Sequence, residues 1–162
     1  MKEAALKKKF LILALALFWG SLPVFSRTGL GVQGGVGVGN LPFHGEAGIT
    51  FKLSTVPVTF GLDYSFAKDF QGIGVTADWW VANPKLFGMF KFYYGPGFAF
   101  HFYNPGTQNP GIFVAARAVL GVNVFVSDVV EFYAQPAVEA GYGTYGGFVF
   151  KVPLDAGVRF WF

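Results

Sequence analysis

The sequence of 162 residues contains no cysteine. The lack of thiols excludes a disulfide scaffold, a thiolate metal site, a cysteine nucleophile and lipid attachment at an N-terminal cysteine. Charged residues are scarce, at 13% of the chain, and with 21 phenylalanines this composition excludes a disordered protein. Long apolar runs are also missing after residue 26, where no stretch reaches the roughly 18 residues that a membrane-spanning helix needs.

The net charge of +3 does not indicate a nucleic-acid partner. The whole excess lies in the first nine residues, where Lys2, Lys7, Lys8 and Lys9 face only Glu3. The basic and acidic side chains of the remaining sequence cancel, so no polyanion is expected to bind the folded part.

Residues 1–26 have the layout of a secretory signal peptide. The basic start is followed by an apolar run from Phe10 to Trp19 and by a break at Gly20, Ser21 and Pro23. The apolar run is too short to cross a bilayer as a helix, which takes about 20 residues. We therefore expect cleavage near Ser26 and one exported domain, residues 27–162.

The rest of the chain is rich in Gly, Phe, Val, Tyr and Thr and is cut by seven turn-forming stretches, which predicts an all-β protein. The eight expected strands are 29–39, 43–53, 58–67, 72–82, 86–103, 112–126, 131–142 and 148–162. In each of them apolar side chains alternate with polar or small ones, so one face of the sheet is apolar and the other is polar.

Eleven of the sixteen charges after residue 26 fall on the polar face, and the other five fall in turns or at the chain start. The eleven are Glu46, Lys52, Asp63, Asp78, Lys91, Arg117, Glu131, Glu139, Lys151, Asp155 and Arg159. The predicted apolar face carries no charge and continues through all eight strands.

Two architectures can use this pattern: a soluble barrel or sandwich with the apolar face inside, or a membrane barrel with that face toward lipid. An eight-stranded barrel has an interior that is only just wide enough for side chains. More than twenty bulky apolar side chains exceed that space, whereas glycines and paired charges fit it. Aromatic residues also gather near both ends of the apolar face, as in an interfacial girdle. The sequence therefore predicts an eight-stranded antiparallel up-and-down transmembrane β-barrel.

The C-terminal segment resembles the assembly signal of outer-membrane barrels. A polar residue, Asp155, is followed by Gly157 and by alternating apolar residues that include Phe160 and end in Phe162. With the signal peptide and eight strands, the chain resembles the small OmpX/OmpA/OmpW-like outer-membrane barrels. This resemblance implies the outer membrane of a diderm bacterium as the location, with membrane lipid and the barrel assembly machinery as partners.

Parity of the strands predicts the topology. If both ends are periplasmic, the connections 40–42, 68–71, 104–111 and 143–147 face outward, and 54–57, 83–85 and 127–130 face the periplasm. Pro96, Pro136 and Pro153 lie within expected strands and predict bulges or local strand ends, because proline cannot donate to the ladder. A real turn at Gly95-Pro96-Gly97 would give nine strands, an alternative less suited to an up-and-down barrel.

The expected function is structural or a surface interaction with an unknown partner, because inward charges of both signs should pair and plug the lumen. The alternatives are a narrow channel or transporter for small or hydrophobic molecules and an outer-membrane lipid-modifying enzyme. His44 and His101, both near the predicted outer rim, are the residues that an enzyme could use, but they lack a clear nucleophile. We therefore expect no enzymatic activity, no metal and no cofactor.

Overall fold

The computed structural model describes residues 27–104, 110–144 and 147–162. The predicted signal peptide, residues 1–26, lies outside the described residues. The strands are β1 (Thr28–Gly39), β2 (His44–Leu53), β3 (Val58–Ala67), β4 (Phe70–Trp79), β5 (Lys85–Phe87), β6 (Phe90–Asn104), β7 (Gly111–Ser127), β8 (Val130–Gly143) and β9 (Gly147–Trp161). Within these ranges no helix is long and apolar enough to cross a membrane.

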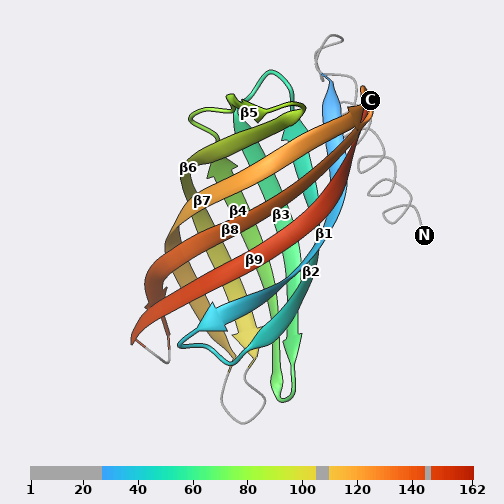
Figure 1. Ribbon diagram of the computed structural model, residues 1–162. Coiled ribbons are helices and arrows are strands. Elements are labelled where there is room, and N and C mark those ends of the chain that lie inside the picture. Colours follow the sequence, from blue (N-terminus) through green and yellow to red (C-terminus); the bar gives the residue numbers. More distant parts are fainter. Residues whose placement is uncertain (1–26, 105–109, 145–146) are drawn as a thin grey trace, which may run out of the picture.

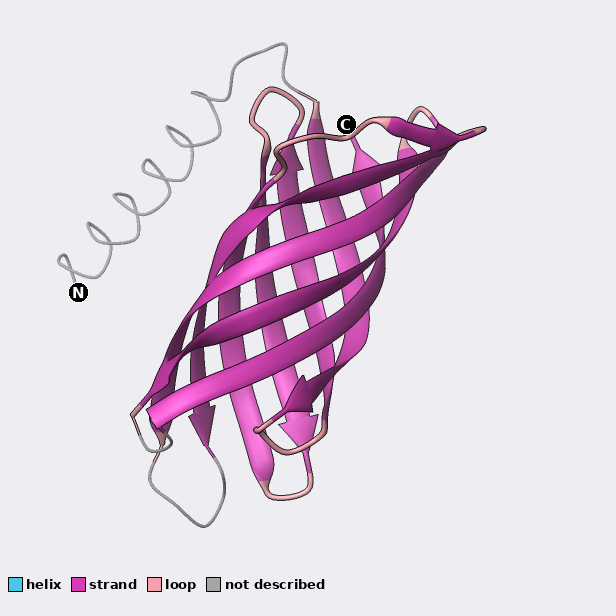
Figure 2. Cartoon of the chain, turned by 60° about the vertical axis from the view of Figure 1, so that its left-hand side comes forward, coloured by secondary structure: helices cyan, strands magenta, loops and turns pink. Residues whose placement is uncertain are grey.

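The sheet closes on itself to form a barrel (Figure 1). Sequential strands pair antiparallel except β4 and β5, β1 also pairs with β9, and the pairing of β4 with β6 closes the wall. Figure 2 shows the same tilted, closed wall from a second direction. Eight strands build this wall in the described part of the chain, and the three-residue β5 adds to β6 alone. The predicted eight-stranded antiparallel barrel is therefore confirmed.

The two ends of the barrel differ. Thr28 and Phe162 exchange backbone hydrogen bonds at the end labelled C in Figure 1, which we call the terminal rim. β5 lies at this rim too. β1, β3, β6 and β8 end at the other end of the barrel, the opposite rim. The β1–β9 and β4–β6 pairings give each of the eight wall strands a neighbour on both sides.

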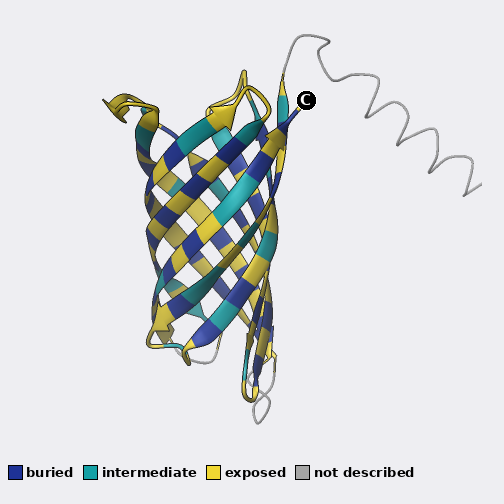
Figure 3. Cartoon of the chain, turned by 45° about the vertical axis from the view of Figure 1, so that its right-hand side comes forward, coloured by how far each residue is buried: buried dark blue, intermediate teal, exposed yellow. Residues whose placement is uncertain are grey.

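Side chains alternate between buried and exposed along the strands of the wall (Figure 3). In β7, Arg117 and Val119 are buried, whereas Ala118 and Leu120 are exposed. The exposed set consists mainly of large apolar residues, and ten of the eleven predicted inward charges are buried. Lys91, at the start of β6, is half-buried. The barrel is thus apolar outside and charged inside.

The structure corrects the strand limits around residue 80. β4 starts at Phe70 and ends at Trp79, and the expected strand 86–103 divides into β5 and β6, with Gly88 in a left-handed conformation (φ 53°) between them. The turn before β4 shrinks to Lys68 and Asp69, and Asp69 has a φ of 59°. Asp tolerates this conformation better than most side chains do, which permits so tight a turn.

The prediction that the strand prolines mark bulges or strand ends is wrong. Pro96 pairs with Ala118 in the same register as Gly95 with Val119 and Gly97 with Arg117, so no turn occurs there. The register of β8 with β9 is also the same on both sides of Pro136 and Pro153. Each proline removes one donor, but the neighbouring ladder bonds hold the register. The bulge of β7 lies instead between Phe125 and Ser127, next to the terminal rim.

Candidate functional site

The interior of the barrel is the candidate site, because it collects the charged side chains. Arg117, from β7, contacts carboxylates from three other strands. Its Nε donates to Asp78 Oδ1 at 2.9 Å, its Nη1 donates to Glu139 Oε1, and its Nη2 lies 3.8 Å from Asp155 Oδ2. The side chain of Arg117 is almost completely buried. One cation therefore connects β4, β7, β8 and β9 across the lumen.

Lys151 extends this network toward the opposite rim. Its Nζ lies 2.5 Å from Glu46 Oε1 and 3.7 Å from Glu139 Oε2. Since Glu139 also binds Arg117, the two cations share one carboxylate. Glu46, Asp78, Glu139 and Asp155 are thus connected by Arg117 and Lys151 into one group, which we call the acidic network.

Both histidines join the acidic network. His44 Nε2 lies 3.1 Å from Glu46 Oε1, and His101 Nε2 lies 3.0 Å from Glu139 Oε2. The other ring nitrogen of His101 is 3.9 Å from Asp63 Oδ2. Ser65 donates its hydroxyl hydrogen to Glu46 at 3.2 Å. Across residues 27–104, 110–144 and 147–162, no group of three or more His, Asp or Glu side chains is arranged to hold a metal ion.

A second group of charges lies at the terminal rim. Glu131 accepts hydrogen bonds from Arg159 Nη1 at 2.7 Å, from Trp161 Nε1 at 2.9 Å and from Asn123 Nδ2 at 2.7 Å. Lys52 Nζ lies 3.8 Å from the centre of the Trp80 ring. Lys91 Nζ, farther out, lies 5.8 Å from the centre of the Phe125 ring. The predicted inward charges therefore form two separate groups.

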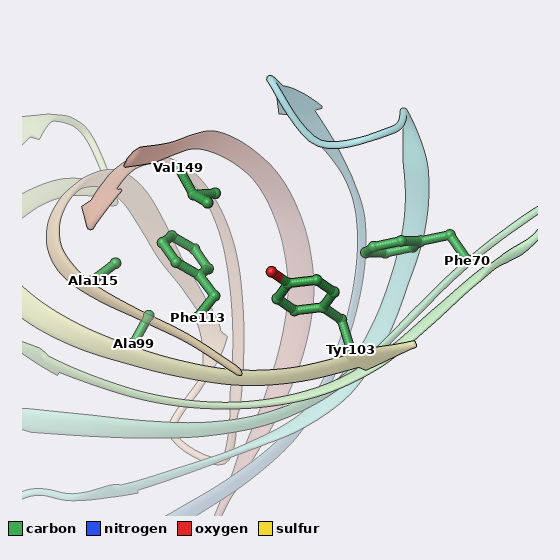
Figure 4. Close-up of a cluster of buried hydrophobic side chains, with 6 residues drawn as sticks. All are labelled: Phe70, Ala99, Tyr103, Phe113, Ala115 and Val149. Atoms are coloured by element: carbon green, nitrogen blue, oxygen red, sulfur yellow. The ribbon is translucent and has the colours of Figure 1, made fainter. Parts of the chain in front are cut away.

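Aromatic and other apolar side chains also lie in the lumen, beside the charged ones. Figure 4 shows one cluster near the opposite rim, in which Phe70, Tyr103 and Phe113 point into the barrel. The other members of this cluster are Ala99, Ala115 and Val149. A second cluster contains Trp80 stacked on Tyr93, with ring centres 3.8 Å apart. Strand parity could have placed Phe113, which lies four residues before the inward Arg117.

Glycines make room for the inward rings. A Cβ atom added to Gly121 would overlap the Tyr93 ring at Cζ, and one added to Gly157 would lie 2.5 Å from Tyr133 Oη. Each glycine pairs directly with the ring residue of the neighbouring strand. Gly37 pairs with His44 and Gly74 pairs with His101 in the same way, and an added Cβ at either glycine would overlap the imidazole ring. The glycines thus allow large rings to lie flat inside a narrow barrel.

Little free space remains near the opposite rim. The cavity between His44, Ser65, Phe70, His101 and Lys151 has a volume of about 10 Å³. A single water molecule needs about this volume, so no organic substrate fits there as the side chains stand.

The residues of the predicted C-terminal signal lie on β9 and its end. Phe160 and Phe162 face outward and are exposed, whereas Asp155 faces the lumen. Gly157 lies against Tyr133 and so has a packing role of its own. A signalling role for these four residues stays a prediction.

No protein-family model matches the chain, and no curated protein matches its sequence. Solved structures do match its fold. Neisserial surface protein A superposes with a TM-score of 0.60 at 16% identity, over 83% of this chain and 96% of that protein. A major outer membrane protein of Thermus thermophilus superposes with a TM-score of 0.51 at 13% identity, over 85% of this chain and 100% of that one. At these identities the likeness shows a shared fold, that of eight-stranded outer-membrane barrels.

Proposed function

We propose that this protein is an integral outer-membrane β-barrel of a diderm bacterium with a structural or surface-interaction role. Its lumen is closed by paired charges and serves neither as a general pore nor as an enzyme site. Residues 1–26 act as the export signal, and the terminal rim faces the periplasm. The likeness of the fold to outer-membrane barrels supports this location.

The observation that carries the proposal is the inversion of polarity across the wall. Leu30, Ile73 and Leu120 each expose about half of their surface. Soluble monomers rarely expose a continuous apolar patch larger than a few hundred Å². A closed barrel wall satisfies its own backbone hydrogen bonds and can therefore lie in lipid. The apolar outer surface is therefore suited to contact with membrane lipid.

Closure of the lumen follows from the contacts inside it. The acidic network links strands on different sides of the barrel through Arg117 and Lys151. Aromatic side chains add to the obstruction near both rims. We infer that ions do not pass freely while these contacts hold.

The same contacts make catalysis by His44 or His101 unfavourable. Each ring is held by a carboxylate of the acidic network, and the hydroxyl of Ser65 binds Glu46. A structural role for His44 and His101 accounts for these bonds. The assembly machinery is the proposed partner of β9, and an unknown surface partner would meet the opposite rim.

The test uses the folded protein without its leader, first in micelles and then in planar lipid bilayers. We expect folding to require detergent or lipid, and we expect no steady conductance above the lipid background. Arg117→Ala should raise conductance because it removes the cation shared by three carboxylates, and the turn variant Lys68→Ala should behave like the unmodified protein.

Two outcomes would contradict the proposal. A protein that stays monodisperse in plain buffer is not a membrane barrel. Steady pores formed by the unmodified protein would exclude closure and favour a narrow channel.

A further inference from the structure

The charges inside the barrel are unevenly divided between its two groups. The acidic network has more carboxylates than cations, with Asp63 near its edge. At the terminal rim the ratio reverses, because Lys52, Lys91 and Arg159 are accompanied by Glu131 alone among the buried carboxylates. Buried charge is costly unless it is paired.

Lys52 shows the imbalance most clearly. It is 8% exposed, and no carboxylate of the described residues lies within 4.0 Å of its ammonium group. Its Nζ instead lies on the Trp80 ring. The guanidinium carbon of Arg159 lies 5.9 Å from the centre of the same ring and 4.5 Å from the centre of the Tyr133 ring. Two buried cations therefore lie close to one indole, and Glu131 is the one buried carboxylate paired with either of them in the described residues.

Donors without acceptors surround this pair. Arg159 is fully buried, and its Nη1 binds Glu131, but its Nε and Nη2 have no hydrogen-bond partner in the part of the chain that the structure describes. The same holds for Trp80 Nε1 and for Thr59 Oγ1, which faces Lys52 across the β2–β3 pair. Glu131 already accepts three hydrogen bonds from other groups.

We propose that Lys52, Thr59, Trp80 and Arg159 form a binding site for a small inorganic anion, of the chloride class, inside the terminal rim. Each of these side chains can donate a hydrogen bond, and two are positively charged, so the site suits an anion and repels a metal cation. All four are less than a tenth exposed, which favours a monatomic ion over a bulky ligand. Together with Glu131, the ion would balance the charges of Lys52 and Arg159 and hold this end of the lumen together.

Bromide locates the site directly, since it replaces chloride and scatters anomalously. Crystals of the full barrel in detergent, soaked in sodium bromide, should show a peak within hydrogen-bond distance of Arg159 and Trp80. In micelles, the unfolding midpoint should rise with chloride concentration and saturate, relative to gluconate at equal ionic strength, because an ion that binds only the folded state stabilises it.

Three variants separate the site from general salt effects. Lys52→Met should abolish the chloride-dependent rise, and Lys91→Met should retain it because Lys91 is half-buried and lies on Phe125. Trp80→Phe keeps a ring but loses the indole N–H, and it should weaken the apparent chloride affinity by about ten-fold or more. It serves as the test if Lys52→Met does not fold.

The proposal fails if chloride and gluconate stabilise equally and no anomalous peak appears, because the donors then bind water. It also fails if the peak lies only among surface residues, as an adventitious ion, or if sulfate alone stabilises the barrel. An unchanged chloride response in Lys52→Met overturns it as well.

Discussion

Arg117 contacts three carboxylates from three different strands, and its burial makes these contacts mutually dependent. When a buried charge loses its partner, the free energy of desolvation is no longer offset by attraction between the two charges. The network therefore stabilises the barrel only as a whole, and no member is expected to be replaceable on its own.

We predict that Arg117→Leu destabilises the folded barrel by about 3–5 kcal/mol, because Asp78, Glu139 and Asp155 lose their shared cation. Urea unfolding in micelles measures the free energy. Lys68→Leu, at an exposed turn, is the control and should change it by only about 0.5 kcal/mol. Equal midpoints for Arg117→Leu and the unmodified protein would show that the network adds nothing to stability.

At the scale of strands, rings over glycines set how closely neighbours pack inside the barrel. Tyr93 on β6 covers Gly121 on β7 and donates to Gln135 Oε1 on β8 at 2.7 Å. A side chain at position 121 would have to share the space that the Tyr93 ring occupies. This explains a glycine in the middle of a long strand, where the residue is otherwise unfavourable.

Gly121→Ala should therefore cost about 1–3 kcal/mol of stability, as an overpacked core does. In a Tyr93→Leu background the same change should cost much less, since the clashing atoms of Tyr93 are gone. Gly34→Ala is the matched control, because an added Cβ there would come no closer than 3.6 Å to its nearest neighbour, Glu46 O. Additive costs of the Gly121 and Tyr93 changes would refute the contact.

At the scale of the whole molecule, the barrel presents opposite chemistry to its two surroundings. Leu120 and Asn123 lie three residues apart on β7, yet Leu120 is 54% exposed and Asn123 is 1% exposed. The parity of the strand alone separates them. If the outer wall lies in lipid, residues on it must be accessible to apolar reagents only.

The natural absence of cysteine allows single-cysteine labelling. In liposomes, Leu120→Cys should react with an apolar maleimide and resist a charged one. Asn123→Cys should resist both until the barrel unfolds, and Val129→Cys, in an exposed turn, should react with the charged reagent. Rapid labelling of Leu120→Cys by the charged maleimide would place the outer wall in water.

The sequence by itself determined the eight strands of the wall, their antiparallel barrel and the inward face of the charged strand residues, because alternation at period two is a local property. It did not predict β5, or that the prolines leave the register intact, because ladder bonds on neighbouring strands decide both. Phe70 was assigned to a turn, although closure of the barrel buries it in the lumen.

Only the tertiary structure decided which charges meet. Arg117 and Asp155 are far apart in the chain but lie close together in the barrel. Lys52 on β2 and Arg159 on β9 both lie near the Trp80 ring, because β1 pairs with β2 on one side and with β9 on the other. Parity assigns a side chain to the inside, but its height and angle around the axis depend on strand tilt and on how the sheet closes. Closure of the barrel therefore brings the lumen charges together as two groups, and this grouping could not be predicted from the pattern of residues along the chain.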